Sequence, residues 1–253
     1  MNEINDSIKS KLNEIEEKEN VRVIMAVESG SRAWGFASPD SDYDVRFIYV
    51  RSTEDYLKLK PVRDVIECQW DDVYDVDGWD LQKALRLLHD SNPTMHEWCN
   101  SPIVYKENEL AEPLRELSKD YFLPKKALFH YINMTEHTCR AYLSGEEVRV
   151  KKYFYALRPI LAARWVAENR TAPPMPFDEL VETQLPLELL PAVQKLLDVK
   201  KHTSELGSGE YIPELDAFIS EQMAVLRAKA EKEENRNNSW EALDAFFRMA
   251  VTK

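Results

Sequence analysis

Hydrophobic positions in the first part of the chain change between helical and strand-like spacing. Apolar residues recur every three or four positions in residues 2–19, which predicts an amphipathic helix. Two apolar runs rich in β-branched residues, VRVIMAV at 21–27 and YDVRFIYV at 43–50, predict buried strands. Ile66 and the segment VYDV at 73–76 indicate one or two further strands. The pattern therefore predicts a sheet accompanied by helices.

Helical spacing returns after the last of these strands. Apolar residues within 81–88 form one stripe, and Asp80 stands where a helix N-cap is expected. Asn92-Pro93 is expected to stop this helix, because proline cannot continue it. The segment SPIVY at 101–105 ends the mixed region.

From about residue 107 onward the pattern is helical almost throughout. One helix is predicted at 128–142 and another at 148–169, with Pro159 inside the second helix or at a kink in it. The segment TAPPMPF at 171–177 predicts a loop. The remainder of the chain alternates helical stripes with short breaks.

These patterns predict an α+β protein in two parts. Residues 1–110 are expected to form a mixed sheet with helices, and residues 111–253 are expected to form an all-helical domain. The length allows two domains, since a domain takes roughly 100–200 residues. Only six glycines are present, which also favours a helix-rich protein.

Charge and cysteine content narrow the classes of function. The net charge of −12 disfavours a wide duplex-binding surface, because phosphate contacts need clustered Lys and Arg. Cys68, Cys99 and Cys139 are odd in number and widely spaced, which argues against a disulfide framework or zinc site and favours the cytoplasm. No apolar run approaches the roughly 18 residues of a membrane span, so no membrane partner is expected.

The segment GSRAWGFASPDSDYD carries the candidate chemistry. Asp42 and Asp44 are separated by one residue at the start of a predicted strand, so their side chains are expected on one face of the sheet. Two neighbouring carboxylates repel each other unless a cation lies between them. Mg²⁺, or Mn²⁺ in its place, held by carboxylates and substrate phosphates is the common solution. The pair therefore predicts a divalent metal site.

The turn at Gly30-Ser31 precedes this pair by ten residues and follows a predicted strand. Glycine lets the backbone approach a phosphate closely, and a helix beginning there would offer free N–H groups to an anion. Ser31 could add a hydroxyl donor and Arg32 a positive charge. A lone Asp-x-Asp or a lone Gly-Ser turn is more often ordinary surface, so the prediction depends on their combination.

This combination resembles the signature of the DNA polymerase β superfamily of nucleotidyltransferases. That signature is a hydrophobic residue, Gly-Ser, a spacer near ten residues and then Asp-hydrophobic-Asp-hydrophobic. The longer strings SGSRAWGFASPDSDYDVRFIYV, GWDLQKALRLL, NPTMHEW and SPIVY resemble the branch linked to bacterial and phage RNA repair. The resemblance to that branch extends from about Val23 to Trp165.

The resemblance implies a third carboxylate on a neighbouring strand, which would bind metal or accept the proton of the acceptor hydroxyl. Five residues compete for this role: Asp71, Asp72, Asp75, Asp77 and Asp80. Asp80 is better explained as a helix cap. Asp75 lies between two apolar residues, as expected of a strand residue facing a site, and is preferred over Asp77.

A second cluster lies in the predicted helix VRVKKYFYALRPILAARW. Lys151, Tyr155 and Arg158 share one helix face, and Lys152 lies a third of a turn away. These residues could form a nucleotide clamp, with the cations near the triphosphate and Tyr155 near the base or ribose. The alternative is an ordinary basic surface. His130 and His137, on the preceding helix, are expected to be structural.

The resemblance implies transfer of a nucleoside monophosphate from a nucleoside triphosphate, with ATP as the expected donor, to an acceptor hydroxyl. Pyrophosphate would be released. The family branch suggests an RNA end as the acceptor, whereas the acidity of the chain favours a small molecule, a short end or a protein side chain. Two alternatives remain open: an antitoxin-like partner protein of the same fold, and a nucleotide-binding module.

Overall fold

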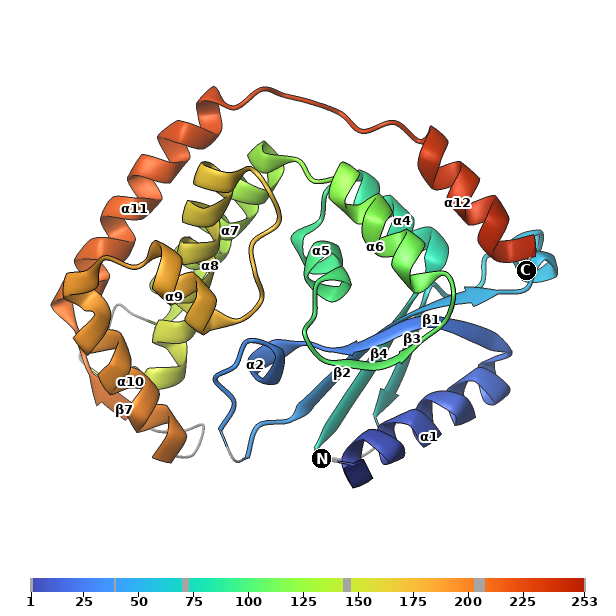
Figure 1. The fold of residues 1–253 in the computed structure, drawn as a ribbon, viewed down its shortest axis with the longest axis horizontal. Helices are drawn as coiled ribbons and strands as arrows, with labels where there is room; N and C mark the ends of the chain where they lie inside the picture. The colour runs from blue at the N-terminus through green and yellow to red at the C-terminus, as the bar shows by residue number, and fades with distance from the viewer. Residues whose placement is uncertain (1, 39, 70–72, 143–146, 203–207, 253) are drawn as a thin grey trace. The chain divides into compact units, whose positions relative to one another are not determined.

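The computed structural model describes residues 2–38, 40–69, 73–142, 147–202 and 208–252, and it divides into two compact units (Figure 1). The sheet unit comprises Met1–Ala33, Asp42–Tyr121 and Asn237–Lys253. The helical unit comprises Trp34–Ser41 and Phe122–Arg236. The predicted α+β class is confirmed. Among the described residues, no helix has the length and apolar character needed to cross a membrane.

The sheet unit contains five strands in the order β3-β4-β2-β1-β5. Their bounds are β1 (Val21–Glu28), β2 (Tyr43–Arg51), β3 (Val65–Gln69), β4 (Tyr74–Asp80) and β5 (Val104–Glu107). β2 and β4 are parallel, whereas β1 pairs antiparallel with both β2 and β5, and β3 pairs antiparallel with β4. The parallel pair matters most for function, because it places Asp44 opposite Asp75.

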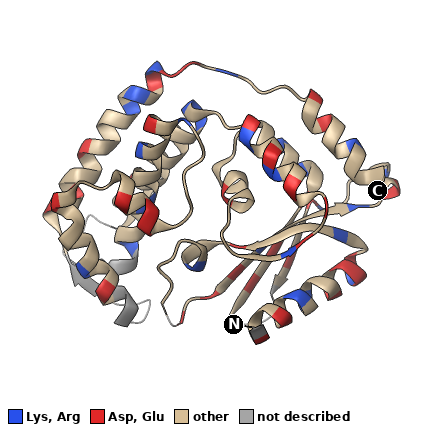
Figure 2. Cartoon of the chain, in the orientation of Figure 1, with Lys and Arg blue, Asp and Glu red and all other residues tan. Residues whose placement is uncertain are grey.

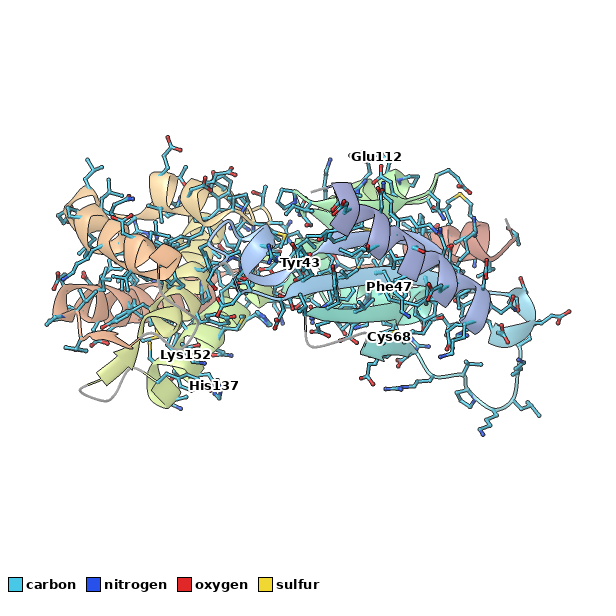
Figure 3. All side chains as sticks on the ribbon, turned by 90° about the horizontal axis from the view of Figure 1, so that it is seen from below. Tyr43, Phe47, Cys68, Glu112, His137 and Lys152 are labelled. Carbon is cyan, nitrogen blue, oxygen red and sulfur yellow. The ribbon has the colours of Figure 1, made fainter. Side chains whose placement is uncertain are left out.

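Strand β2 alternates between two apolar layers. Val45 and Phe47 belong to one core cluster with the helix α1 (Asn2–Glu19), whereas Ile48 belongs to a second cluster on the other face. Figure 3 labels Phe47 and Tyr43 along β2 as seen from the α1 side. Gly78 of β4 lies opposite Phe47, where an added Cβ would come within 2.2 Å of the ring. Glycine at this position leaves room for the aromatic ring against the neighbouring strand.

Four helices cover the second face of the sheet, and two short helices follow β1 and β2. The first group is α4 (Leu81–His89), α5 (Pro93–Cys99), α6 (Ala111–Asp120) and α12 (Glu241–Thr252), and the short helices are α2 (Gly30–Ala33) and α3 (Thr53–Tyr56). Both α1 and α6 carry acidic and basic residues (Figure 2). The Asp80 carboxylate accepts the Gln82 N–H at 2.8 Å, which confirms the predicted cap of α4.

The break expected at Asn92-Pro93 is present, and the same two residues also start a further helix. α4 ends before this pair, and the pair starts α5, where the Asn92 side chain accepts the Thr94 N–H at 2.9 Å and Pro93 occupies the first helical position. Proline is favoured there because its fixed φ suits a helix start and its missing N–H has no partner to lose. The same two residues therefore separate α4 from α5 and begin α5.

The helical unit consists of α7 (Pro124–Tyr142), α8 (Val150–Asn169), α9 (Phe177–Gln184), α10 (Leu190–His202), α11 (Pro213–Lys232) and the 3₁₀ turn Leu187–Leu189. α8 continues through Pro159, which lies inside the helix. A short antiparallel ladder joins β6 (Glu147–Arg149) and β7 (Ser208–Glu210), which the sequence pattern did not predict.

The unit boundaries differ from a single division at residue 110. α6 and the C-terminal helix α12 both belong to the sheet unit. The spacer Trp34–Ser41, which separates the Gly-Ser turn from the aspartate pair in sequence, belongs to the helical unit. The two halves of the candidate motif are thus connected by a segment whose packing partners come from elsewhere in the chain.

Candidate active site

The amino-terminal ends of β2 and β4 bring two aspartates together. Asp44 and Asp75 are direct partners in the parallel register. Directly opposed residues of paired strands project to the same face of the sheet, so the two carboxylates lie side by side on that face. Asp42 is exposed and directly precedes β2, two residues before Asp44. The acids that the sequence predicted as a site therefore lie at one end of one strand pair.

Arg46 lies between the two opposed acids. Its Nη2 donates to Asp44 Oδ1 at 3.1 Å and to Asp75 Oδ2 at 2.6 Å. Its Nη1 donates to the backbone carbonyls of Asp75 at 2.9 Å and Val45 at 3.2 Å. One cationic nitrogen is therefore shared by both carboxylates, which shows that their oxygens converge on a common point.

Gly30 is in close contact with Asp44. It has a φ of +61°, and a Cβ built on it would lie 2.0 Å from Asp44 Oδ2. The Ser29 N–H also donates to the Asp44 carbonyl at 2.8 Å. Glycine is required here for two reasons, its left-handed backbone and the absence of a side chain. The Gly-Ser turn and the aspartate pair, separated by ten residues in sequence, are thus parts of one structural feature.

Ser31 and Arg32 follow in the short helix α2. Ser31 is buried. The Arg32 Nε donates to the Asp42 carbonyl at 3.0 Å, and its guanidinium lies 3.7 Å from the centroid of the Tyr43 ring. These contacts fix Arg32 against the residues that begin β2, and they place a positive charge beside the predicted metal ligands.

Glu28 is a residue of this site that the sequence reasoning missed. It is fully buried, and its carboxylate accepts the Asp44 N–H at 2.9 Å and the Tyr105 hydroxyl. Burial raises its pKa to about 7, against the lowering effect of these hydrogen bonds. An acid that ends an otherwise apolar strand was the available signal, since buried strands rarely carry an acid without a structural or functional reason.

The remaining third-acid candidates have different surroundings. Asp77 lies opposite Arg46 on β2 and Glu67 on β3, and burial raises its pKa. Asp80 is buried as the α4 cap, so its predicted structural role is confirmed. Asp71 and Asp72 lie outside the described residues. The geometry favours Asp75, because it is opposite Asp44 and shares the same guanidinium.

The predicted clamp residues all lie on α8, and they differ in exposure. Lys151 is within the helix, and its side chain is not described. Lys152 Nζ lies 3.5 Å from the centroid of the Tyr142 ring, in the region labelled in Figure 3. Arg158 is only 3% exposed, and its Nε donates to the Met175 carbonyl at 3.4 Å. Burial of this guanidinium within the helical unit favours a structural role.

Tyr155 and Arg158 contact the spacer of the motif. The Arg158 guanidinium lies 4.5 Å from the centroid of the Trp34 ring, and Tyr155 meets the same ring edge-to-face at 5.8 Å. Phe36 is stacked on Phe154 at 5.0 Å in the same core. The Trp34 carbonyl accepts the Phe177 N–H at 2.8 Å. The spacer is therefore a packed part of the helical unit.

Histidines 130 and 137 do not join a metal cluster. His137 is exposed on α7, and His130 is half-buried with its ring edge against Tyr131 at 5.8 Å. Within the described residues, no three His, Cys, Asp or Glu side chains lie close enough to cage an ion by themselves.

The donor chemistry nevertheless fits Mg²⁺ or Mn²⁺. Mg²⁺ prefers oxygen ligands and is commonly held by one or two carboxylates, with water and substrate phosphates completing its shell. Asp44 and Asp75 already converge on one cationic nitrogen, so this pair meets that smaller requirement. Asp42 lies two residues before Asp44 and is open to solvent.

A cavity of about 480 Å³ lies at the opposite end of the same strands. Arg51 of β2, Asp80 of β4 and Arg86 of α4 are among its lining residues. None of the predicted site residues lines it. Its acids have partners already, as with Asp80, whose oxygens accept from Gln82 N–H and the Tyr56 hydroxyl. The cavity is therefore separate from the acidic cluster.

A Gly-Ser turn closed against an Asp-Tyr-Asp strand start, with another aspartate on the neighbouring strand, is the arrangement expected of polymerase β-like nucleotidyltransferases. The chain belongs to the RlaP family, the RNA repair pathway DNA polymerase beta family, whose model matches residues 4–249. The family inferred from the motif is thus confirmed over nearly the whole chain.

Two individual proteins can be compared with the chain. The protein named Uncharacterized protein YcgL from Bacillus subtilis (strain 168) is 45% identical over 230 residues, 88% of each chain. A crystal structure of a nucleotidyltransferase-like protein from Exiguobacterium sibiricum 255-15 matches 96% of this chain and 75% of that chain, at 11% identity. Its TM-score is 0.29, which is too low to support an argument about the site.

Proposed function

We propose that this protein is a metal-dependent nucleotidyltransferase that moves a nucleoside monophosphate from a nucleoside triphosphate to an acceptor hydroxyl. The observation that carries the proposal is the convergence of Asp44 and Asp75 on one cation, directly beside the Gly30 turn. Membership of a polymerase β family supports it. ATP is the first donor to test.

Asp42, Asp44 and Asp75 would hold Mg²⁺ or Mn²⁺. When bound, the ion neutralises phosphate charge and polarises the phosphoryl oxygens. The acceptor oxygen bonds to the α-phosphorus while the bond to the pyrophosphate oxygen breaks. Asp75, the more exposed of the two opposed acids, accepts the proton of the acceptor hydroxyl at a carboxylate oxygen. Most of the catalytic effect comes from positioning and charge neutralisation.

Gly30 and Ser31 would bind the β and γ phosphates, and Arg32 would add charge beside them. The support is positional: the turn contacts Asp44, so a phosphate held there lies next to a metal ligand. Arg32 is already fixed at the Asp42 carbonyl. A positive group near both phosphate and carboxylates lowers the cost of assembling so many negative charges.

The four clamp residues receive two separate roles. Lys151 and Lys152, in the first turn of α8, would contact the triphosphate. Tyr155 and Arg158 would hold the spacer through Trp34, since both already contact its ring. In this second role they position the segment that connects the Gly-Ser turn to the aspartates, and they need not touch the nucleotide.

An RNA end is the acceptor suggested by the family. With a net charge of −12, the chain would hold only a terminus through few phosphate contacts. Each contact contributes roughly 0.7 to the salt slope of single-strand binding, so a slope on the order of −1 to −3 is expected. A steeper slope would indicate an extended RNA track. A small molecule or a protein side chain is the other acceptor class.

The test is incubation of the purified protein with each α-labelled nucleoside triphosphate, Mg²⁺ or Mn²⁺, and a panel of RNA, small-molecule and protein acceptors. Pyrophosphate release together with a labelled acceptor is the expected result. Nucleotide binding without transfer to any acceptor would favour a nucleotide-binding module. Absence of both would favour an antitoxin-like partner protein.

A further inference from the structure

We propose that Arg46 is a built-in counter-cation that occupies the metal position between Asp44 and Asp75 and yields it to the metal–nucleotide complex. This inference rests on the proposed function and adds a regulatory step to the same site. It makes Arg46 a positioning residue, because it acts on the reaction through the two carboxylates it holds.

The two ends of the guanidinium have separate partners. Among the described residues, Nη2 donates to carboxylate oxygens, at 3.1 Å from Asp44 and 2.6 Å from Asp75. Nη1 donates to backbone carbonyls, those of Val45 and Asp75. The carbonyl contacts can persist when the carboxylate contacts are exchanged. Arg46 can therefore stay bound to the strands through Nη1 while Nη2 leaves the two carboxylates.

The electrostatic need for a cation at this point follows from the sheet register. Like charges directly opposite each other on paired strands destabilise the pairing. Asp44 faces Asp75, and Asp77 follows on the same strand two residues later. Arg46 is the cation in contact with both opposed carboxylates in the described structure. It holds β2 and β4 together at an end where their acids would otherwise repel.

A divalent ion would need the same oxygens. Free Mg²⁺ or Mn²⁺ must displace Nη2 from charge-assisted hydrogen bonds, which are about twice as strong as neutral ones. An ion already carrying a triphosphate brings further oxygen ligands and nearby contacts to the Gly30 turn. Arg46 thus selects against the free ion and in favour of the loaded one. The acids are kept neutralised and in register until the nucleotide arrives.

The experiment measures Mn²⁺ binding without nucleotide, by electron paramagnetic resonance of the free ion, for wild type and three variants. Arg46→Gln removes the competing charge and is expected to bind Mn²⁺ on the order of tenfold more tightly. Arg46→Lys keeps the charge without the paired contacts, so its affinity for Mn²⁺ should lie between that of wild type and that of Arg46→Gln. Arg63→Gln is the matched control, because it removes the same charge from an exposed pair with Glu67 at 2.5 Å.

If Arg46 has only a structural role, its substitution should not increase the affinity for Mn²⁺. If Arg46→Gln and Arg46→Lys bind Mn²⁺ no more tightly than wild type while both remain folded, the proposal is overturned. If Arg46→Gln fails to fold, Arg46→Lys alone decides in the same way. Label transfer by the wild-type protein tests the proposed function separately. If the wild type transfers label but the variants bind Mn²⁺ with unchanged affinity, only the counter-cation role of Arg46 is rejected. Tighter Mn²⁺ binding in the variants, with no wild-type transfer to any acceptor, rejects only the transferase reaction.

Discussion

The two ends of the parallel strands β2 and β4 both carry acids, in different surroundings. At the carboxyl end, Asp80 is buried and its oxygens accept a helix N–H and the Tyr56 hydroxyl. At the amino end, Asp44 and Asp75 oppose each other and share the single guanidinium of Arg46. The first acid is satisfied by neutral donors, whereas the second pair depends on a cation.

This difference separates a structural aspartate from a candidate metal ligand. A carboxylate whose two oxygens already accept from backbone and hydroxyl donors is held in place by them, and a metal would have to compete with those bonds. Opposed carboxylates held by an exchangeable cation can accept another cation in its place. The contrast predicts that substitutions at the amino end affect chemistry, and that those at the carboxyl end affect stability.

Among substitutions outside the Asp42 and Asp44 pair itself, the largest effect is expected from Gly30→Ala. The added Cβ would lie 2.0 Å from Asp44 Oδ2 at a φ of +61°, so the Asp44 carboxylate or the turn must move. We expect a loss of transfer activity of at least about 10²-fold, since misplaced catalytic groups cost that much, and a destabilisation of about 1–3 kcal/mol from backbone strain. Initial rates and urea unfolding would measure the two effects.

Gly35→Ala is the control for this change. Gly35 also has a positive φ, of +82°, but an added Cβ meets nothing within 4 Å. It should share the strain without the displacement of Asp44. Equal losses of activity in both variants would show that backbone strain, and not contact with the carboxylate, explains the Gly30 effect.

The next largest effect distinguishes Asp75 from Asp77. Asp75→Asn should lower kcat by about 10²-fold or more, because it removes both the proposed general base and one carboxylate of the proposed metal site. Asp77→Asn should have a much smaller effect, because Asp77 faces Arg46 and Glu67 instead of Asp44. Single-turnover rates and nucleotide titrations would check both. The reverse pattern would move the third ligand two residues along β4.

Glu28 sharpens the comparison because it is a buried acid at the amino end whose carboxylate accepts hydrogen bonds from neutral donors, the Asp44 N–H and the Tyr105 hydroxyl. Its folded pKa of about 7 lies above the ordinary 4.5, so the folded state binds this proton more tightly than the unfolded state. The resulting stability is present below pH 4.5 and is lost as pH rises through 7. Glu28→Gln should flatten this dependence, leaving a relative gain of up to about 3 kcal/mol at pH 8.

Urea unfolding at several pH values in metal-free buffer would measure the Glu28 effect. The glutamine retains an oxygen for the Asp44 N–H and a polar group for Tyr105, so the local bonds have replacements. An unchanged slope of stability against pH between 4.5 and 7 would contradict the assignment of this proton to Glu28.

The smallest effect is expected at the carboxyl end. Asp80→Ala removes the α4 cap and the acceptor of the Tyr56 hydroxyl, so it should destabilise the protein by about 1–2 kcal/mol. Transfer activity of the folded fraction should stay near that of wild type. Thermal unfolding and parallel rate measurements on Asp80→Ala would measure both quantities. A large loss of kcat would contradict the distinction between the amino and carboxyl ends of β2 and β4.

Local sequence patterns predicted the parts of this site that depend on local structure. Apolar runs marked β1 and β2, and the position of Asp80 before an apolar stripe marked the α4 cap. The Gly-Ser turn and the Asp-Tyr-Asp pair stood out because their spacing and residue types recur in one superfamily. Each of these signals is contained within a short window of the chain.

Long-range pairing decided what the sequence could not predict. Arg46 meets Asp75 only because β2 and β4 are parallel in one register, although 29 residues separate the two in sequence. Arg158 looked like a surface clamp from its helical spacing, but Trp34 and Met175, both distant in sequence, bury it. Helical periodicity predicts on which side of a helix a residue lies, but it does not predict which other segments pack against that side.

Label transfer from an α-labelled nucleoside triphosphate, compared between amino-end and carboxyl-end aspartate variants, tests the central claim most directly. Asp42→Asn and Asp44→Asn should lose transfer by about 10³-fold or more while staying folded, because each removes a carboxylate of the proposed metal site. Asp80→Asn should transfer label at close to the wild-type rate. Wild-type transfer in Asp44→Asn, measured on folded protein with the same metal and nucleotide, would contradict the account.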